Sequence, residues 1–271
     1  AGLSSAITAT EKGAKVIVLE KMAYFGGNSN RSEGEMNAAG TKQQKAHGIT
    51  DDTPERFAAD TIRGGHGLND PALVKALTEN AASAEEWLLD LGAHFCHRMG
   101  RGGGQTRARG HGPCDGSPVG IEIMRVLGER ADKDHIDMRL NNRVTKILMK
   151  NGKVSGVQVK TPKGMETINA KAVILATGGF HANKALVTQF MGGEVAWMPI
   201  RGSMTLTGEN ILLTAPFFPM YVNMDQFHAG PIHGPTKANP SQMVNFGICV
   251  NTLGNRYVDE ASTYVEIARH T

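Results

Sequence analysis

The sequence predicts an α/β fold with an antiparallel insert. Residues 15–20 (KVIVLE) and 172–176 (AVILA) are short apolar runs of the kind found in strands buried within a parallel sheet. Between them, the turns Asn151-Gly152 and Pro162-Lys163-Gly164 join strand-like runs, which predicts antiparallel hairpins. Segments with an apolar stripe at helical spacing alternate with these runs, which favours mixed layers of helices and strands.

Each element is placed by its pattern and by its start or stop signals. The opening helix ends at Gly13, and Asn69-Asp70-Pro71 is a cap followed by a proline in the first turn. The predicted helices span residues 1–12, 54–64, 71–91 and 118–133, the last with Ile121, Met124, Leu127 and Ala131 on its apolar face. The predicted strands span residues 15–20, 94–98, 136–140, 144–149, 154–161, 165–169 and 172–176, while residues 21–50 and 99–117 are expected to form loops.

The composition excludes several classes of protein. Hydrophobic residues make up 40% and charged residues 20% of the 271 residues, which excludes a long disordered chain. The net charge of +3 gives no chain-wide signal for a polyanionic partner, and no apolar run approaches the ~20 residues that cross a bilayer. Three cysteines are too few for a disulfide scaffold and fit a reducing compartment, so we expect a cytoplasmic protein.

Both ends of the sequence indicate a fragment. A helix packed on a parallel strand normally follows an earlier strand, and none precedes the opening helix. Residues 266–271 (EIARHT) stop within a helix-like pattern without a cap. We therefore expect Ala1 not to be the biological start.

Three glycine clusters are candidates for ligand contacts. Gly2 opens a helix, and Glu20 follows about 20 positions later, as in folds that bind a dinucleotide pyrophosphate and its ribose. Residues 25–29 (FGGNS) and 34–39 (GEMNAA) offer backbone N–H groups at low steric cost. Residues 176–179 (ATGG) lie at the carboxyl end of a predicted strand, where ligands of α/β sheets bind. Each cluster also has a plain structural explanation, as a solvated strand end, a surface loop and a strand-ending turn.

In this order, the clusters resemble a known family. The segments VIVLEK, FGGNS, MNAAGT, AVILATGG, TGE and NTLGNRYVDE are similar to the FAD-binding part of the fumarate reductase/succinate dehydrogenase flavoprotein superfamily. That superfamily includes soluble fumarate reductases, urocanate reductases and 3-ketosteroid dehydrogenases. The resemblance implies FAD as cofactor, a Rossmann-like FAD-binding domain over residues 1–185 with the antiparallel insert, and the start of a cap or substrate domain over 186–271.

The resemblance also implies a role for individual residues. Glu20 matches the ribose ligand, Val144 a backbone contact to adenine, and Glu209 an aspartate that holds the ribityl chain, although Glu209 is one methylene longer. Glu35 stands where the family has a small residue beside the flavin, so its charge needs a partner or a shifted pKa. The implied cofactor contacts are Ala1, Gly2, Glu20, Lys21, Gly27, Asn28, Ser29, Gly34, Met36, Asn37, Val144, Ala176, Thr177, Gly178, Gly179, Thr207, Gly208 and Glu209.

The candidate catalytic residues are Tyr264 and His228. Fumarate reductases have a proton-donating arginine in a Glu-x-x-x-Arg pattern, and here tyrosine takes that place in Glu260-Ala261-Ser262-Thr263-Tyr264. Their Thr-Glu-x-x-Arg is also missing, since residues 240–243 read PSQM. Tyr264 instead resembles the tyrosine base of 3-ketosteroid dehydrogenases, with Arg269 and His270 as candidates to assist it, and packing as the alternative explanation.

His228 matches the substrate-binding histidine of fumarate reductases, with a structural role and the nearby His233 as alternatives. The resemblance thus implies an oxidoreductase that adds or removes hydrogen across a C–C bond activated by a carbonyl, similar to 3-ketosteroid dehydrogenases. The alternatives are a fumarate- or urocanate-type reductase and a truncated flavin-binding module without turnover.

Two further patterns point to other ligands, but only weakly. Cys96-His97 and His111-x-x-Cys114 offer a zinc ligand set, but adjacent ligands make a poor chelate, so no metal site is expected. Residues 98–116 carry four arginines among glycines, as RNA-binding tracts do, yet they lack aromatic residues for stacking. We expect a small-molecule substrate and an electron donor or acceptor as partners, and neither nucleic acid nor a membrane span.

Overall fold

The computed structural model describes residues 1–95, 99–230, 247–260 and 262–270, which form two compact units. Unit 1 contains residues 1–35, 86–95 and 112–222, and unit 2 contains the other described residues. Both mix helices and strands, so the predicted α/β class with an antiparallel insert is confirmed. The units interleave along the sequence, and the predicted domain boundary at residue 185 remains a prediction.

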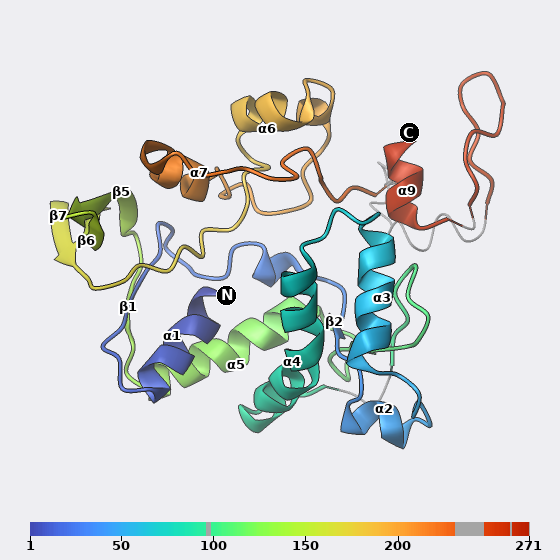
Figure 1. The fold of residues 1–271 in the computed structure, drawn as a ribbon, viewed down its shortest axis with the longest axis horizontal. Helices are drawn as coiled ribbons and strands as arrows, with labels where there is room; N and C mark the ends of the chain where they lie inside the picture. Colours follow the sequence, from blue (N-terminus) through green and yellow to red (C-terminus); the bar gives the residue numbers. More distant parts are fainter. Residues whose placement is uncertain (96–98, 231–246, 261, 271) are drawn as a thin grey trace. The chain divides into compact units, whose positions relative to one another are not determined.

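Unit 1 is built around a short parallel strand pair and two packed helices. β1 (Ile17–Leu19) pairs in parallel with β4 (Asp137–Arg139), so strands form within the predicted ranges 15–20 and 136–140. The residues of β1 are half-buried rather than buried as expected. α1 (Gly2–Glu11) lies against α5 (Val119–Lys133) in Figure 1. Leu3, Ala6 and Ile7 of α1 and Val126, Leu127 and Ala131 of α5 are buried.

The buried face of α5 differs from the predicted one. Leu127 and Ala131 are buried as expected, whereas Ile121 is 52% exposed. The reason is a close backbone approach at Gly120, where a Cβ would lie 1.7 Å from the carbonyl oxygen of Ser29 in the short 3-10 helix η1 (Ser29–Arg31). This contact turns Val119 and Gly120 inward and leaves Ile121 in solvent.

Gly120→Ala is expected to destabilise the protein by about 1–3 kcal/mol, because the added methyl must displace backbone rather than a flexible side chain. Gly64→Ala is the matched control, since Gly64 is also helical but a Cβ added there would meet no atom within 4 Å. This control should stabilise by up to ~1 kcal/mol. Thermal unfolding followed by circular dichroism measures both, and equal stability of the two variants would contradict the contact.

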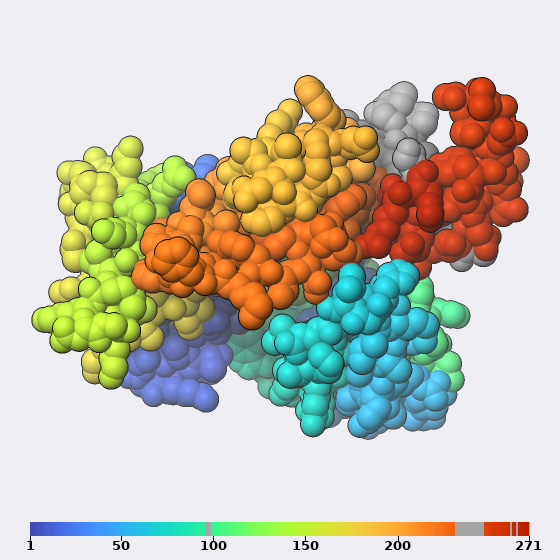
Figure 2. Space-filling model, turned by 45° about the horizontal axis from the view of Figure 1, so that its top comes forward, coloured from blue at the N-terminus to red at the C-terminus, as the bar shows by residue number. Residues whose placement is uncertain are grey.

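The antiparallel insert forms as predicted. β5 (Arg143–Lys150), β6 (Lys153–Thr161) and β7 (Gly164–Asn169) are three consecutive antiparallel strands, with Val144 opposite Val159 and Val157 opposite Ile168. Asn151 and Gly152 both have positive φ, 52° and 73°, which the predicted tight turn requires. Figure 2 shows this sheet, in yellow-green, at the surface of unit 1.

The predicted strand at residues 172–176 does not form. Its backbone has no regular secondary structure, and Ile174 is 67% exposed. An apolar run becomes a buried strand only when neighbouring strands pair with it, and none of the described strands does so. In the predicted strand at 94–98, only the bridge of Phe95 to Pro113 is seen, and residues 96–98 lie outside the described residues.

The remaining helices of unit 1 follow the three-stranded sheet in the sequence. Asn183 caps the first of them, because its side chain accepts a hydrogen bond from the Leu186 N–H. Gly208 precedes another with a φ of 83°, a left-handed conformation that favours glycine. These elements are α6 (Lys184–Met191), η2 (Val195–Trp197), α7 (Glu209–Thr214) and η3 (Ala215–Phe217).

The described part of unit 2 is mostly helical and contains one short strand pair. β2 (Met36–Asn37) pairs antiparallel with β3 (Gly110–His111). Its described helices are α2 (Lys42–Ala46), α3 (Pro54–Gly64), α4 (Pro71–Asp90, whose last turns belong to unit 1) and α9 (Tyr264–Arg269). A core of Ala38, Ala39, Phe57 and Ala81 packs between them. None of the described helices is both long and apolar enough to span a membrane.

Candidate functional site

Unit 1 brings three of the predicted glycine segments together. A Cβ at Gly2 would lie 3.4 Å from the Ala176 Cβ, so the start of α1 touches the end of the 172–176 segment. Gly27 and Gly178 both have positive φ, and a Cβ added at either would lie against Leu206, at 3.5 Å and 2.6 Å respectively. The start of α1, the 27–29 loop and the 176–179 turn therefore meet next to the Thr207-Gly208-Glu209 segment.

The loop after β1 is tied to the same region. The Asn28 Oδ1 accepts a hydrogen bond of 2.7 Å from the Ser203 N–H, while Ser29 begins η1 and is exposed. The Glu20 Oε1 accepts one of 2.8 Å from the Met22 N–H, and its backbone N–H donates to the Arg139 carbonyl. These bonds hold Glu20 at the carboxyl end of β1, where the sequence predicts a residue that binds the ribose.

The buried carboxylate of Glu209 is the centre of an ionic cluster. The Oε1 of Glu209 accepts hydrogen bonds from the Lys21 Nζ, from the Thr207 Oγ1 at 2.7 Å and from the Arg143 Nη2 at 3.3 Å. Burial raises the pKa of Glu209, but the bonds from Lys21 and Thr207 outweigh it and leave the pKa below its usual value of 4.5. Glu209 is therefore a carboxylate at neutral pH. Glu209 and Val144 line the same small cavity of about 120 Å³.

This region fits a ligand that is rich in hydroxyl groups. Three buried acceptor-capable oxygens find no hydrogen-bond partner among the described residues: Thr177 Oγ1, Glu209 Oε2 and Asn210 Oδ1. Buried polar atoms normally have partners, and sugar hydroxyls would supply them. Ala1 gives α1 no side-chain cap, so the first N–H groups of α1 remain available for a pyrophosphate. These features match the contacts that FAD needs.

Glu35 is exposed, so its charge is hydrated in this structure. Its place beside the flavin remains a prediction. Gly34 is exposed as well and belongs to unit 1. Met36 and Asn37, which are also predicted flavin contacts, belong to unit 2.

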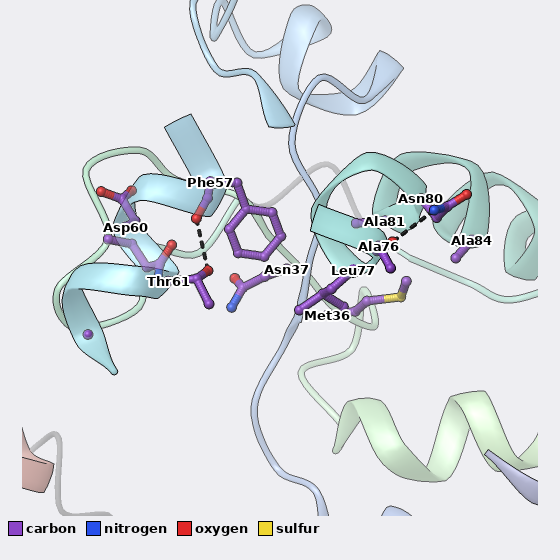
Figure 3. A pocket seen from close by; sticks show the side chains of 12 residues that line it. Met36, Asn37, Phe57, Asp60, Thr61, Ala76, Leu77, Asn80, Ala81 and Ala84 are labelled. Carbon is purple, nitrogen blue, oxygen red and sulfur yellow. Dashed lines mark hydrogen bonds between the residues drawn. The ribbon is translucent and has the colours of Figure 1, made fainter. Parts of the chain in front are cut away.

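A large cavity of about 680 Å³ lies within unit 2. Figure 3 shows Asn37 directed toward Phe57 and Thr61 of α3, and Met36 directed toward α4. Polar side chains of its lining are already engaged with the protein. Thr61 donates to the Phe57 carbonyl and Asn80 to the Ala76 carbonyl, each at 2.8 Å. Asp60 and Gln105 both accept hydrogen bonds from Arg109. The other lining surface is largely apolar. The cavity is also lined by Asp60, Gly64, Leu77, Ala81, Ala84 and Gln105.

A fully buried arginine lies behind this cavity. Arg109 is 0% exposed and contacts both oxygens of Asp52, at 2.7 and 3.0 Å, and the Asp60 Oδ2 at 2.9 Å. Its guanidinium carbon lies 4.8 Å from the centre of the Phe57 ring. Burial raises the pKa of Asp60, but hydrogen bonds from Thr106, Arg63 and Arg109 hold it well below its usual range. Sequence reasoning missed this cluster, because it treated Arg109 only as one charge of a glycine-rich tract.

His111 connects the arginine cluster to β2. Its Nδ1 lies 2.8 Å from the Arg109 carbonyl and 3.2 Å from the Met36 carbonyl, and two acceptors there require a proton on Nδ1. Its Nε2 then accepts from the Thr41 hydroxyl at 2.9 Å. Burial lowers the pKa of His111, which favours this neutral form. Both ring nitrogens of His111 therefore have protein partners. Cys96 and His97, which belong to the zinc ligand set considered in the sequence, lie outside the described residues.

Tyr264 is the first residue of α9. Thr263 caps this helix through a hydrogen bond from the Glu266 N–H, and its methyl group lies against Gly103 and Gly104. The His66 Nε2 lies 3.1 Å from the Glu266 Oε1 and joins α9 to the residues after α3. The backbone of Tyr264 is therefore held against the glycine-rich loop, while its side chain lies outside the described part of the structure.

The other predicted catalytic groups are only partly visible. His228 is exposed, and His233 and residues 240–243 lie outside the described residues. The Arg269 Nη2 donates to the Gln226 Oε1 at 3.0 Å, and His270 is exposed at the end of α9. The catalytic roles of Tyr264 and His228 therefore remain predictions.

Comparison with known proteins gives a consistent result. A family model described as "FAD binding domain" matches residues 1–269. "Fumarate reductase (cytochrome)" of Shewanella frigidimarina is 37% identical over 268 residues, which cover 97% of this chain and 46% of that protein. The chain therefore spans about half the length of such curated relatives.

Solved structures extend this similarity. The open conformation of a flavocytochrome c3 fumarate reductase matches with a TM-score of 0.88 and 34% identity, over 99% of this chain and 48% of the other. A 3-ketosteroid-Δ4-(5α)-dehydrogenase from Rhodococcus jostii RHA1 matches with a TM-score of 0.84 over 99% of this chain and 61% of the other. At 24% identity, this second match shows a shared fold.

Proposed function

This chain belongs to the FAD-binding domain family, and on that premise we propose that the whole protein is an FAD-dependent oxidoreductase acting on a C–C bond activated by a carbonyl group. The cofactor is FAD, which when bound supplies hydride transfer. The residues of unit 1 would bind it through the start of α1, Glu20 and Glu209. The chain's remaining tasks are to orient the substrate and to move a proton.

The first candidate is a reductase of an unsaturated carboxylic acid. The observation that supports it is 37% identity, sustained over 97% of the chain, to a protein named fumarate reductase. Relatives named urocanate reductase and acrylate reductase flavoprotein subunit match over 96% and 92% of the chain. This order of similarity favours the carboxylate reductases over the ketosteroid-type reading of the sequence.

The second candidate is an enone dehydrogenase of the 3-ketosteroid type. It is favoured by Tyr264, which stands where fumarate reductases have a carboxylate-handling arginine. A phenol can exchange a proton with a carbon beside a ketone but cannot form the bidentate pair that a carboxylate prefers. In either case, His228 is proposed to contact the substrate carbonyl.

Two measurements on the full-length protein separate these candidates. Flavin reduced by dithionite without oxygen is mixed with fumarate, urocanate or acrylate, and recovery of the ~450 nm flavin absorbance reports reduction of the substrate. Oxidised flavin is mixed with a saturated 3-ketosteroid, and bleaching of the same band reports dehydrogenation. We expect recovery with at least one of the carboxylates. Bleaching by the ketosteroid alone would favour the second candidate, and a yellow protein that responds to neither would indicate a binding module.

A further inference from the structure

We propose that Lys21 is a positioning residue that reserves the free carboxylate oxygen of Glu209 for a sugar or sugar-alcohol hydroxyl of the bound dinucleotide. Lys21 would then affect the cofactor only through Glu209 and would not itself contact it. This inference rests on the proposed FAD-binding function, and the experiment below keeps the two apart.

The two oxygens of Glu209 have different surroundings. Oε1 accepts three hydrogen bonds, from Lys21, Thr207 and Arg143. An oxygen with two lone pairs has no capacity left for a further donor. Oε2 is buried and finds no donor among the described residues. The side chain is only 9% exposed, so bulk water does not readily fill that place. One oxygen therefore anchors the side chain and the other is left as an acceptor.

The charge of Glu209 restricts what can occupy this place. An ionised carboxylate accepts hydrogen bonds and repels other anions, so a phosphate group is excluded as the direct partner. A hydroxyl group fits, because its bond to a carboxylate is charge-assisted. FAD has hydroxyls on its ribose and on its ribityl chain, and the Glu209 cavity is also lined by Arg143 and Val144.

Lys21 holds the Glu209 side chain in this orientation. Its Nζ donates to the Glu209 Oε1 and, at 3.0 Å, to the Thr207 Oγ1, and Thr207 in turn donates to Glu209. Lys21, Thr207 and Glu209 form a closed ring of hydrogen bonds, although Lys21 and Glu209 lie 188 positions apart in the sequence. Such a ring fixes the extra rotatable bond that glutamate has relative to aspartate. It also supplies the positive charge that keeps a buried carboxylate ionised.

A double-mutant cycle on the full-length apoprotein tests the inference. FAD is titrated into the protein and its dissociation constant is read from the change in flavin fluorescence. Glu209→Gln and Lys21→Met are each expected to weaken FAD binding about tenfold, as a charge-assisted bond is lost or misplaced. The double variant should bind as Glu209→Gln does, because Lys21 acts through Glu209. Effects that multiply to about one hundredfold would overturn the inference and indicate a direct contact by Lys21.

A pH series supplies an independent readout. Without Lys21, burial of Glu209 is opposed only by the remaining bonds, including those from Thr207 and from the half-exposed Arg143, so the pKa of Glu209 should rise. As the pH is lowered, the FAD affinity of Lys21→Met should therefore fall at a higher pH than that of the wild type. Lys21→Arg should follow the wild type, and Glu209→Gln should show no such fall. A profile for Lys21→Met that coincides with that of the wild type would contradict the positioning role.

Two controls separate the possible failures. Lys12→Met removes an exposed lysine at the end of α1 and should leave FAD affinity unchanged. If the wild-type protein does not bind FAD, the proposed function fails. If the wild type binds FAD but the effects of the two substitutions on the dissociation constant multiply in the double variant, only the proposed role of Lys21 is contradicted.

Discussion

Tyr264→Phe is expected to lower the rate of substrate turnover about 100- to 10,000-fold, the usual contribution of a positioned acid or base. The change removes one oxygen and keeps the ring, so folding and FAD content should not change. A phenol with a pKa near 10 is protonated at neutral pH and can deliver a proton when the substrate is reduced. Stopped-flow absorbance at ~450 nm measures the rate, and the absorbance of the purified protein measures bound FAD.

Tyr24→Phe is the control, since Tyr24 is 50% exposed in unit 1 and no catalytic role is proposed for it. It should retain full turnover. If Tyr264→Phe also retained full turnover, Tyr264 would be a packed aromatic residue, and the proton would have to come from another group. Loss of FAD together with activity would indicate a folding defect rather than a missing proton donor.

Arg109→Met is expected to reduce the free energy of unfolding of unit 2 by about 3–5 kcal/mol. The change leaves the carboxylates of Asp52 and Asp60, both less than 6% exposed, without the cation that neutralises them. Arg63 still reaches Asp60 from the surface, but no other described arginine or lysine reaches Asp52. Hydrogen exchange of the α3 amides in the full-length protein measures the loss locally.

Arg107→Met is the matched control. Arg107 is close in sequence and pairs with Asp51, but that pair lies at the surface, where removal changes stability by at most ~1 kcal/mol. The Asp51 pKa is lowered to about 2, chiefly by its hydrogen bond to Arg107. Similar protection of α3 in both variants would show that the buried cluster does not stabilise unit 2. Arg109→Lys should fall between them, because lysine cannot form the bidentate contact with Asp52.

Local signals in the sequence predicted most helices well. α3 spans residues 54–64 as expected, because Thr53 caps it and Pro54 occupies its first turn. The hairpins β5–β7 followed from their turn residues. α2 was missed, although Thr41 caps it, because five residues are too few to show a helical period.

Features that depend on distant residues were harder to predict. The AVILA segment has the composition of a buried strand, but whether a strand forms depends on partners elsewhere. The resemblance pointed to Lys21 and Glu209 individually, yet it gave no sign that they share a hydrogen bond. Arg109 could not be identified at all, because an arginine among glycines looks exposed until Asp52 and Asp60 are placed around it.

The exposed run at 172–176 has a practical consequence for handling these 271 residues by themselves. An exposed apolar segment that no described strand covers can pair with a strand from another molecule, which is a common first step toward aggregates. Ile174 and Leu175 make this the first place to look if a preparation becomes turbid on concentration. Samples for spectroscopy are therefore best kept dilute, with light scattering as a routine check of solubility.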